Sequence, residues 1–163
     1  MTISVRDANP ADLEFVVDCN ARLARETEGK ELPVDLLRPG VAAALADAGK
    51  ARYWIAEHTA SESQESLAVG QLMVTLEWSD WRNGNFWWLQ SVYVLEPYRR
   101  QGVFSSLYQH VAKLAAESPA VCGLRLYVEE ENHRAQQVYR NLGMTPTRYH
   151  VYETELLRQP PPN

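Results

Sequence analysis

Residues 94–104 read Val94-Leu95-Glu96-Pro97-Tyr98-Arg99-Arg100-Gln101-Gly102-Val103-Phe104, and they are the most informative stretch of the sequence. It follows a nearly continuous apolar run, residues 86–95, which indicates a strand buried on both faces. After the two arginines and Gly102, apolar residues recur at helical spacing. The stretch is therefore predicted to be a turn from a buried strand into a helix.

This turn has the construction of a pyrophosphate site. The first backbone N–H groups of a helix lack partners and lie at the positive end of the helix dipole. A glycine lets an anion approach these groups closely, and Arg99 and Arg100 add positive charge. The plainer alternative is a strand-to-helix turn with two solvated arginines. Neither standard nucleotide motif, G-x-x-x-x-G-K-[ST] or G-x-G-x-x-G, occurs in the sequence.

Hydrophobic periodicity on either side of the turn predicts an α+β fold. Asn9 is expected to cap the first helix, which ends at Gly29. The second helix is expected to be interrupted near Pro39 and closed by Gly49. The predicted order is β-α-α-β-β-β-α-β-α-β, with strands at 3–6, 53–57, 69–78, 86–95, 121–128 and 148–156 and helices at 10–28, 33–48, 102–118 and 132–142.

The three middle strands are expected to be antiparallel neighbours, with Asn83-Gly84 as a hairpin signal. One face of the strand at 69–78 is expected to carry Leu72, Val74, Leu76 and Trp78. The later β-α-β crossover makes the sheet mixed but mostly antiparallel, with helices on its faces. A single domain is expected at residues 1–157, followed by a disordered, proline-rich tail at 158–163.

Composition excludes several functional classes. The 163 residues carry 16 Lys+Arg and 21 Asp+Glu, a formal net charge of -5, and coating nucleic acid would need a basic face instead. The longest apolar stretch is too short to span a membrane, and the N-terminus lacks the features of a secretory signal. Cys19 and Cys122 are expected to be free thiols in a reducing cytosol, which predicts a cytoplasmic protein. The histidines and cysteines form no metal-binding pattern, so no metal is expected.

Two motifs resemble those of the GCN5-related N-acetyltransferases (GNAT). Arg99-x-x-Gly102-x-Phe104 is similar to the [QR]-x-x-G-x-[GA] motif, which cradles the pyrophosphate of acetyl-CoA in that family. Asn132-x-x-Ala135-x-x-x-Tyr139-x-x-x-Gly143-Met144 is similar to the family's second signature. The order of elements also matches, over about residues 2–156. One departure is Phe104, which stands where the family has Gly or Ala, although its side chain also fits the apolar face of the predicted helix.

The resemblance implies the GNAT fold and acetyl transfer from acetyl-CoA to a primary amine by direct attack within a ternary complex. In that family a bulge splays the fourth strand from the fifth, and the pantetheine arm lies in the gap. One strand N–H beside the acyl group would then be the oxyanion donor. Tyr139 is implied as the acid that protonates the CoA thiolate, and a plain core position is the alternative. The cofactor-binding residues that the resemblance implies are Val92, Tyr93, Val94, Arg99, Arg100, Gln101, Gly102, Val103, Phe104, Asn132 and Tyr139.

The general base and the acceptor site are the least defined by the sequence. Glu77, within the strand at 69–78, is the candidate base, and a solvated strand residue is the alternative. Glu26 and Glu28 lie in an acidic stretch after the first helix that would suit a cationic amine, although such runs are usually solvated loops. Trp78 belongs to a group of tryptophans that could line an acceptor pocket or form a homodimer contact. Small polyamines, amino acids, antibiotics and peptide amines all stay open as acceptors.

Two competing functions use the same predicted fold. One is a binding module that holds an acyl-CoA as a sensor or structural ligand without turnover. The other is an interaction protein that uses its tryptophan-rich surface. Turnover of acetyl-CoA in the presence of amines separates the enzyme from both.

Overall fold

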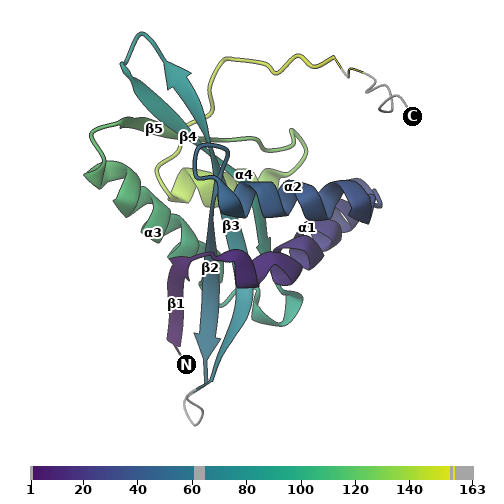
Figure 1. Cartoon of the computed structure of the whole chain (residues 1–163). Coiled ribbons are helices and arrows are strands. Elements are labelled where there is room, and N and C mark those ends of the chain that lie inside the picture. The colour runs from purple at the N-terminus through teal and green to yellow at the C-terminus, as the bar shows by residue number, and fades with distance from the viewer. Residues whose placement is uncertain (1, 61–64, 155, 157–163) are drawn as a thin grey trace. The chain divides into compact units, whose positions relative to one another are not determined.

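The structure is a computed structural model that describes residues 2–60, 65–154 and 156. These residues belong to two compact units, Met1–Tyr127 and Val128–Asn163, and each unit is described by itself. The expected domain end at residue 157 and the tail at 158–163 lie outside the described residues. The first unit contains β1 (Thr2–Asp7), η1 (Pro10–Asp12), α1 (Leu13–Glu28), α2 (Val34–Ala46), β2 (Arg52–Thr59), β3 (Ser66–Ser79), β4 (Gly84–Val94), η2 (Glu96–Tyr98), α3 (Val103–Glu117) and β5 (Val121–Leu126), and the second contains α4 (His133–Asn141) (Figure 1).

The first unit is built on a sheet with strand order β1-β2-β3-β4-β5. Neighbours from β1 to β4 are antiparallel, and β5 joins β4 in parallel. The connection from β4 to β5 runs through α3, as a parallel pair requires. The predicted mixed, mostly antiparallel sheet with one β-α-β crossover is confirmed.

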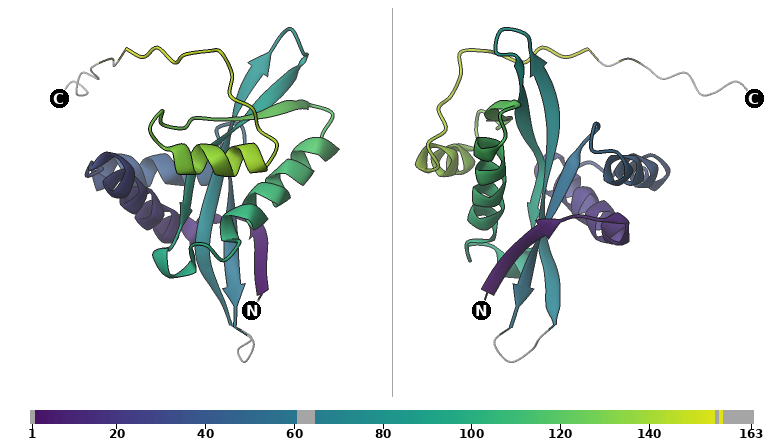
Figure 2. Two further views of the ribbon diagram at one scale, coloured as in Figure 1. Left: turned by 180° about the vertical axis from the view of Figure 1, so that it is seen from behind. Right: turned by 60° about the vertical axis from the view of Figure 1, so that its left-hand side comes forward.

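Helices cover both faces of this sheet, as expected (Figure 2). On one face α3 packs down, and its Leu107 joins Trp54 of β2 in a buried core. On the other face α1 and α2 pack, and Val16 of α1 meets Ile55 of β2. Trp54 and Ile55 serve different cores because successive strand residues point to opposite faces.

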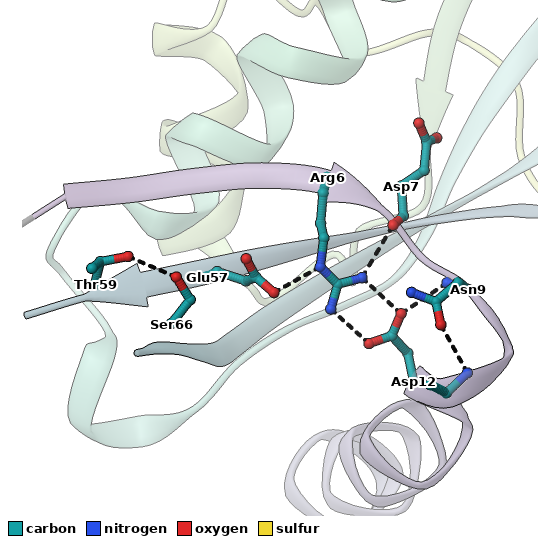
Figure 3. Close-up of polar contacts among 8 residues, drawn as sticks. Arg6, Asp7, Asn9, Asp12, Glu57, Thr59 and Ser66 are labelled. Atoms are coloured by element: carbon teal, nitrogen blue, oxygen red, sulfur yellow. Dashed lines mark hydrogen bonds and ion pairs between the residues drawn. The ribbon is translucent and has the colours of Figure 1, made fainter. Parts of the chain in front are cut away.

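Polar contacts centred on Arg6 hold the junction between β1 and α1 (Figure 3). The Asn9 side chain accepts the Ala11 N–H at 2.9 Å, and Asp12 accepts the Asn9 N–H at 2.8 Å, which confirms the predicted N-cap. The Arg6 guanidinium donates to both oxygens of Asp12 at 2.8 Å and to Glu57 at 2.7 Å. The hydrogen bonds from Arg6 lower the pKa of Asp12, which is only 7% exposed. We call Arg6, Asp12 and Glu57 the β1 anchor.

The expected interruption of the second helix is wrong, because α2 runs through Pro39 without a break. A proline in a helix removes one hydrogen bond and crowds the carbonyl four residues earlier. Leu37 and Val41 pack into the core under α1 and α2 on both sides of Pro39, and this packing offsets the local cost. Asp47, rather than Gly49, is the C-cap, and its side chain accepts the Gly49 N–H at 2.9 Å.

The face of β3 that carries Leu72, Val74, Leu76 and Trp78 is buried over only part of its length. Leu72 and Val74 are buried, but Leu76 is 42% exposed and Trp78 is 59% exposed. Figure 1 shows that the β3–β4 hairpin extends beyond the helices of this unit at this end. The alternating pattern therefore predicts which way these side chains face but not how far the helix cover reaches.

The strand expected at 148–156 is wrong for the residues that the structure describes there, 148–154 and 156, none of which is in a strand. Aromatic and β-branched residues favour extended backbone, but a strand forms only where a second strand supplies hydrogen-bond partners. Tyr149 and Tyr152 are 81% and 94% exposed. The last part of the strand expected at 121–128 is also absent, since β5 ends at Leu126.

Candidate functional site

A bulge interrupts β4 at Ser91. The β3–β4 register pairs Gln71 with Tyr93 but Met73 with Gln90, so β4 has one extra residue between these pairs. Ser91 has a φ of 47°, in the left-handed region that costs an ordinary residue about 1–2 kcal/mol. The surrounding structure must therefore hold this backbone in place.

The pairing of β4 with β5 also ends just before this bulge. Parallel pairs run from Asn85↔Val121 to Leu89↔Leu126, and the described residues show no pairing of the two strands beyond that point. The main chain of Val92 lies past this break and opposite the shift in the β3 register. The end of β4–β5 pairing and a bulged backbone thus occur together.

The turn from β4 into α3 contains two residues in the left-handed region, Arg100 with φ 64° and Gly102 with φ 83°. Gly102 is the N-cap of α3, and its carbonyl accepts the Ser106 N–H at 2.9 Å. The N–H groups of the first turn, starting at Val103, have no acceptors within the helix and point out of its end. A Cβ built on Gly102 meets nothing within 4 Å, so the space beside this glycine is open. The turn can take an anion there.

The Arg99 side chain lies along β4 and α1 rather than over the turn. Its Nε donates to the Val94 carbonyl at 2.9 Å, and its Nη2 donates to Glu26 at 2.7 Å. The Tyr93 hydroxyl donates to the other Glu26 oxygen at 2.5 Å. We call Glu26, Tyr93 and Arg99 the Glu26 cluster, and it joins the end of α1 to the strand just after the bulge.

The Glu26 cluster also sets the charges beside the bulge. The hydrogen bond from Tyr93, and then that from Arg99, lowers the pKa of Glu26, so this carboxylate is ionised at neutral pH. Burial, and then the hydrogen bond to Glu26, raises the pKa of Tyr93 to about 12. Glu26 is therefore a fixed negative charge and a poor proton acceptor.

Glu77, the candidate base, lies toward the hairpin end of β3. It is opposite Phe86, which precedes Ser91 by five residues in β4. That separation corresponds to about 17 Å along the strand. The Glu77 carboxylate accepts a hydrogen bond from Trp88 Nε1 and forms an ion pair with Arg125 at 2.7 Å.

The three residues expected at the acceptor site are not all brought together. Glu26 reaches the strand after the bulge. Glu28, two residues later at the end of α1, is exposed and pairs with Lys30 at 2.6 Å. Trp78 lies opposite Asn85 at the far end of β4, so it is on the hairpin rather than beside the bulge.

In the second unit, Asn132 and Tyr139 both belong to α4. The Asn132 side chain caps the helix and accepts the Ala135 N–H at 3.0 Å. Tyr139 is half-buried, and this burial raises the pKa of its phenol. The phenol is therefore protonated at neutral pH, which a general acid requires.

Phe104 does not enter the core below α3. Its neighbour Val103 is 2% exposed and does so, whereas Phe104 is half-buried on the helix with its ring centroid 6.3 Å from that of Tyr108. Its backbone N–H still belongs to the open first turn of α3.

Gln71 is the residue of this region that the sequence pattern does not single out. It is 0% exposed, and its Nε2 donates to the Ser91 carbonyl at 3.0 Å and to Asn20 Oδ1 at 2.6 Å. Strand alternation alone gives Gln71 the appearance of a solvent-facing polar residue. The usable signal is Asn20, a polar residue on the apolar face of the first helix, because such a residue needs a buried partner.

Membrane-spanning helices and clustered metal ligands are both absent from the described part of the chain. No helix there is long and apolar enough to cross a membrane. Those residues also contain no group of three or more His, Cys, Asp or Glu side chains that could hold a metal ion.

Comparisons with known proteins agree with this geometry. A model of the Acetyltransferase (GNAT) family matches residues 21–144. Thialysine N-epsilon-acetyltransferase of Bos taurus is 29% identical over 147 residues, which cover 86% of this chain and 83% of that protein.

Solved structures have the same fold. The crystal structure of "a possible acetyltransferase from Clostridium difficile 630" is 42% identical, with a TM-score of 0.85, over 97% of this chain and 100% of that one. A "predicted acetyltransferase with acetyl-CoA" from Clostridium acetobutylicum is similar in fold alone, at 17% identity and a TM-score of 0.73, over 94% of this chain and 96% of that one. The chain belongs to the GNAT family and is an acyl-CoA-dependent acetyltransferase.

Proposed function

We propose that this protein transfers the acetyl group of acetyl-CoA to a primary amine by direct attack within a ternary complex. The observation that carries the proposal is the Ser91 bulge together with the end of β4–β5 pairing at Leu89. These two features leave room beside a strand whose backbone can bind a thioester. The strand then leads directly into the open turn at Gly102.

In this proposal the turn holds the pyrophosphate of acetyl-CoA. The N–H groups from Gln101 to Phe104 belong to the turn and the first turn of α3, next to the open space beside Gly102, and the helix dipole favours negative charge there. Arg100 is exposed and adds positive charge. Arg99 donates hydrogen bonds to Glu26 and to the Val94 carbonyl, so its side chain ties the start of the turn to α1 and β4.

The acyl group would lie against the main chain of Val92, Tyr93 and Val94. Attack by an amine on a thioester puts negative charge on the carbonyl oxygen, and a backbone N–H fixed in advance stabilises that charge. Asn132 would contact the cofactor through its amide N–H₂ while its oxygen caps α4.

The acceptor is proposed to be a primary amine carried on a cationic molecule. Glu26 is a fixed carboxylate beside the bulge, and Glu28 adds acid at the end of α1. The bovine relative is named for the Nε amine of thialysine, which fits such a site. Trp78, in β3 opposite the far end of β4, is proposed to contact the distal part of a larger acceptor.

The amine must be neutral to attack, and its deprotonation is proposed to occur before attack. Glu77 is paired with Arg125 toward the hairpin end of β3, away from the bulge, and the lowered pKa of Glu26 makes that carboxylate a poor proton acceptor. The rate constant kcat/KM should therefore rise with pH toward the pKa of the amine, about 10.4 for a lysine-type amine. An inflection near the pKa of a carboxylate would instead point to a protein base such as Glu77.

Tyr139 is proposed to protonate the departing thiolate. Tyr139→Phe should lower kcat by roughly 100-fold, the lower end of general acid catalysis, while the Kd for acetyl-CoA changes little. Steady-state kinetics and calorimetry on the full chain measure the two quantities. An unchanged kcat rejects the role, and a parallel loss of acetyl-CoA binding assigns Tyr139 to the cofactor site or the core instead.

The experiment for the function as a whole is thiol release from acetyl-CoA with a panel of amines. The panel should contain thialysine, lysine, small polyamines, an aminoglycoside and a peptide N-terminus, at pH values from 7 to 9. Saturable release with at least one cationic amine is expected. Thiol release no faster than in buffer across the panel, together with saturable acetyl-CoA binding, would favour the alternative of a binding module. The ion pair of Glu77 with Arg125 is consistent with that alternative, because it occupies the candidate base.

We also propose a cytoplasmic location. Cys19 and Cys122 are free thiols, and such thiols are typical of a reducing compartment. Burial raises the pKa of Cys19 to about 12, so this thiol is not a nucleophile at neutral pH. Cell fractionation with an antibody to the chain tests the location.

A further inference from the structure

Gln71 of β3 occupies an unusual place for a polar side chain. It is 0% exposed, and its amide lies between β4 and α1. The Nε2 group uses both of its hydrogens, one on the Ser91 carbonyl at 3.0 Å and one on Asn20 Oδ1 at 2.6 Å. Asn20 in turn donates to the Tyr53 hydroxyl at 3.3 Å. The amide is therefore fixed from two sides.

This arrangement is kept at a cost. Gln71 Oε1 is buried and has no hydrogen-bond partner among the described residues, which typically costs about 1–3 kcal/mol. Ser91 adds the cost of a left-handed φ of 47°. Unsatisfied groups and strained backbone that persist together are characteristic of functional sites.

The geometry of the peptide unit connects Gln71 to the chemistry. A peptide bond is planar and trans, so the carbonyl of Ser91 and the N–H of Val92 lie in one plane and point in opposite directions. Holding the carbonyl toward the Gln71 amide therefore aims the Val92 N–H away from it. Val92 lies in the part of β4 that the β3 register skips and that β5 no longer pairs with.

We propose that Gln71 is a positioning residue that holds the Ser91 carbonyl and thereby aims the Val92 N–H at the carbonyl oxygen of the bound thioester. This role rests on the proposed acetyl transfer. Gln71 touches neither substrate nor cofactor in this role, and acts through the backbone of the bulge. Asn20 supports it by fixing the amide of Gln71.

Gln71→Met tests the role, since methionine has a similar length and volume but cannot donate a hydrogen bond. The expected result is a loss of roughly 10- to 100-fold in kcat, below the effect of deleting an oxyanion donor, because the donor is misaimed rather than removed. The Kd for acetyl-CoA should change less than threefold. Gln90→Met is the matched control, because Gln90 precedes Ser91 but donates to Thr75 Oγ1 instead of the bulge carbonyl. Its kcat should stay within threefold of that of the unaltered protein.

A kcat for Gln71→Met within threefold of the unaltered protein would overturn the proposal. So would equal losses in kcat and in acetyl-CoA affinity, because these would indicate a general structural role. If Gln71→Met does not fold, Asn20→Leu and Asn20→Asp replace it. Asn20→Asp keeps an acceptor for the Gln71 amide and should retain kcat, whereas Asn20→Leu should lose it, and equal behaviour of the two contradicts the proposal.

A second readout keeps this role separate from the proposed function. Amide hydrogen exchange at Ser91 and Tyr93, on either side of the open Val92 N–H, can be followed in the full chain without substrates. Gln71→Met should speed exchange at these amides at least tenfold relative to Gln90→Met, and equal exchange in the two variants would overturn the positioning role. If the unaltered protein acetylates none of the amines, the proposed function fails, while this measurement still decides whether Gln71 holds the bulge.

Discussion

Two arginine–carboxylate clusters in this fold, the β1 anchor and the Glu26 cluster, differ in how far they are exposed to solvent. The β1 anchor pairs Arg6 with Asp12 through two hydrogen bonds of 2.8 Å, and the Asp12 side chain is 8% exposed. The Glu26 cluster pairs Arg99 with Glu26 through one bond of 2.7 Å, and both side chains are about 40% exposed, at 38% and 43%. The carboxylate of the arginine pair at the start of α1 is therefore buried, whereas that of the pair at its end is exposed.

The difference in exposure separates what each cluster does. Removing one partner of a buried pair leaves a charge without compensation, which is strongly destabilising. An exposed pair contributes about 0–1 kcal/mol to stability, so its charges are available for a ligand. The β1 anchor should therefore respond to substitution in stability, and the Glu26 cluster in catalysis.

The largest expected effect is that of Asp12→Ala on stability. It removes both bonds from Arg6 and the cap on the Asn9 N–H, and should lower the free energy of unfolding by about 2 kcal/mol, less than for a fully buried pair because Arg6 can rehydrate. Denaturant unfolding measures this loss. The kcat of the folded variant should not change, and a stability within 0.5 kcal/mol of the unaltered protein, on the order of a surface substitution, would contradict the anchor role.

Gly102→Ala should weaken acetyl-CoA binding roughly tenfold or more. A Cβ at φ 83° is strained and projects into the open space proposed for the pyrophosphate. Gly29→Ala is the matched control, because Gly29 also has a positive φ, 63°, and open space around its Cβ position. Calorimetric titration with acetyl-CoA should show a changed Kd for Gly102→Ala but not for Gly29→Ala. Equal Kd values for the two variants would show that the turn at Gly102 does not bind the cofactor.

Glu26→Gln should raise the KM for a cationic amine about three- to tenfold, because it removes a charge but keeps oxygen and nitrogen atoms beside Tyr93 and Arg99. The melting temperature should stay within about 2 °C, as expected for an exposed pair. Kinetics with a neutral amine of similar size provide the control. A KM that rises equally for the cationic and the neutral amine would show that Glu26 contributes to the shape of the site and does not recognise the charge of the amine.

The smallest effect is expected on acidification. The pKa of Asp12 is lowered in the folded protein, so its contribution is present above the unfolded pKa of about 3.9 and is lost as pH falls through the folded pKa. The stability difference between the unaltered protein and Asp12→Asn should therefore be full at pH 7 and should shrink below about pH 4. A difference that stays constant down to pH 2 would assign the stabilisation to packing rather than to the charge of Asp12.

The elements that the sequence predicts well are those whose signals are local. The strand, the turn at Gly102 and the helix after it follow from an apolar run, a glycine and a 3.6-residue period. Asn9 as a cap is equally local, because the capping contacts lie within three residues. These signals locate the turn proposed for the cofactor.

The elements that the sequence predicts poorly depend on partners far away in the chain. Pro39 stays in a helix because of the core under α1 and α2, and residues 148–154 have strand-like composition without a strand partner. The contact of Gln71 with Ser91 joins residues that no period relates. The motif likewise assigns Arg99 to the phosphate directly, but its side chain forms a hydrogen bond with Glu26, 73 residues earlier.

A crystal structure of the full chain with acetyl-CoA would test the proposed cofactor site and oxyanion donor together. We expect the pyrophosphate against the N–H groups of residues 101–104 and the thioester carbonyl oxygen within hydrogen-bond distance of the Val92 N–H. We also expect the acetyl carbon to be accessible from the side of Glu26. Acetyl-CoA bound elsewhere on the chain, or a thioester whose oxygen faces away from the backbone of residues 92–94, would overturn the proposed mechanism.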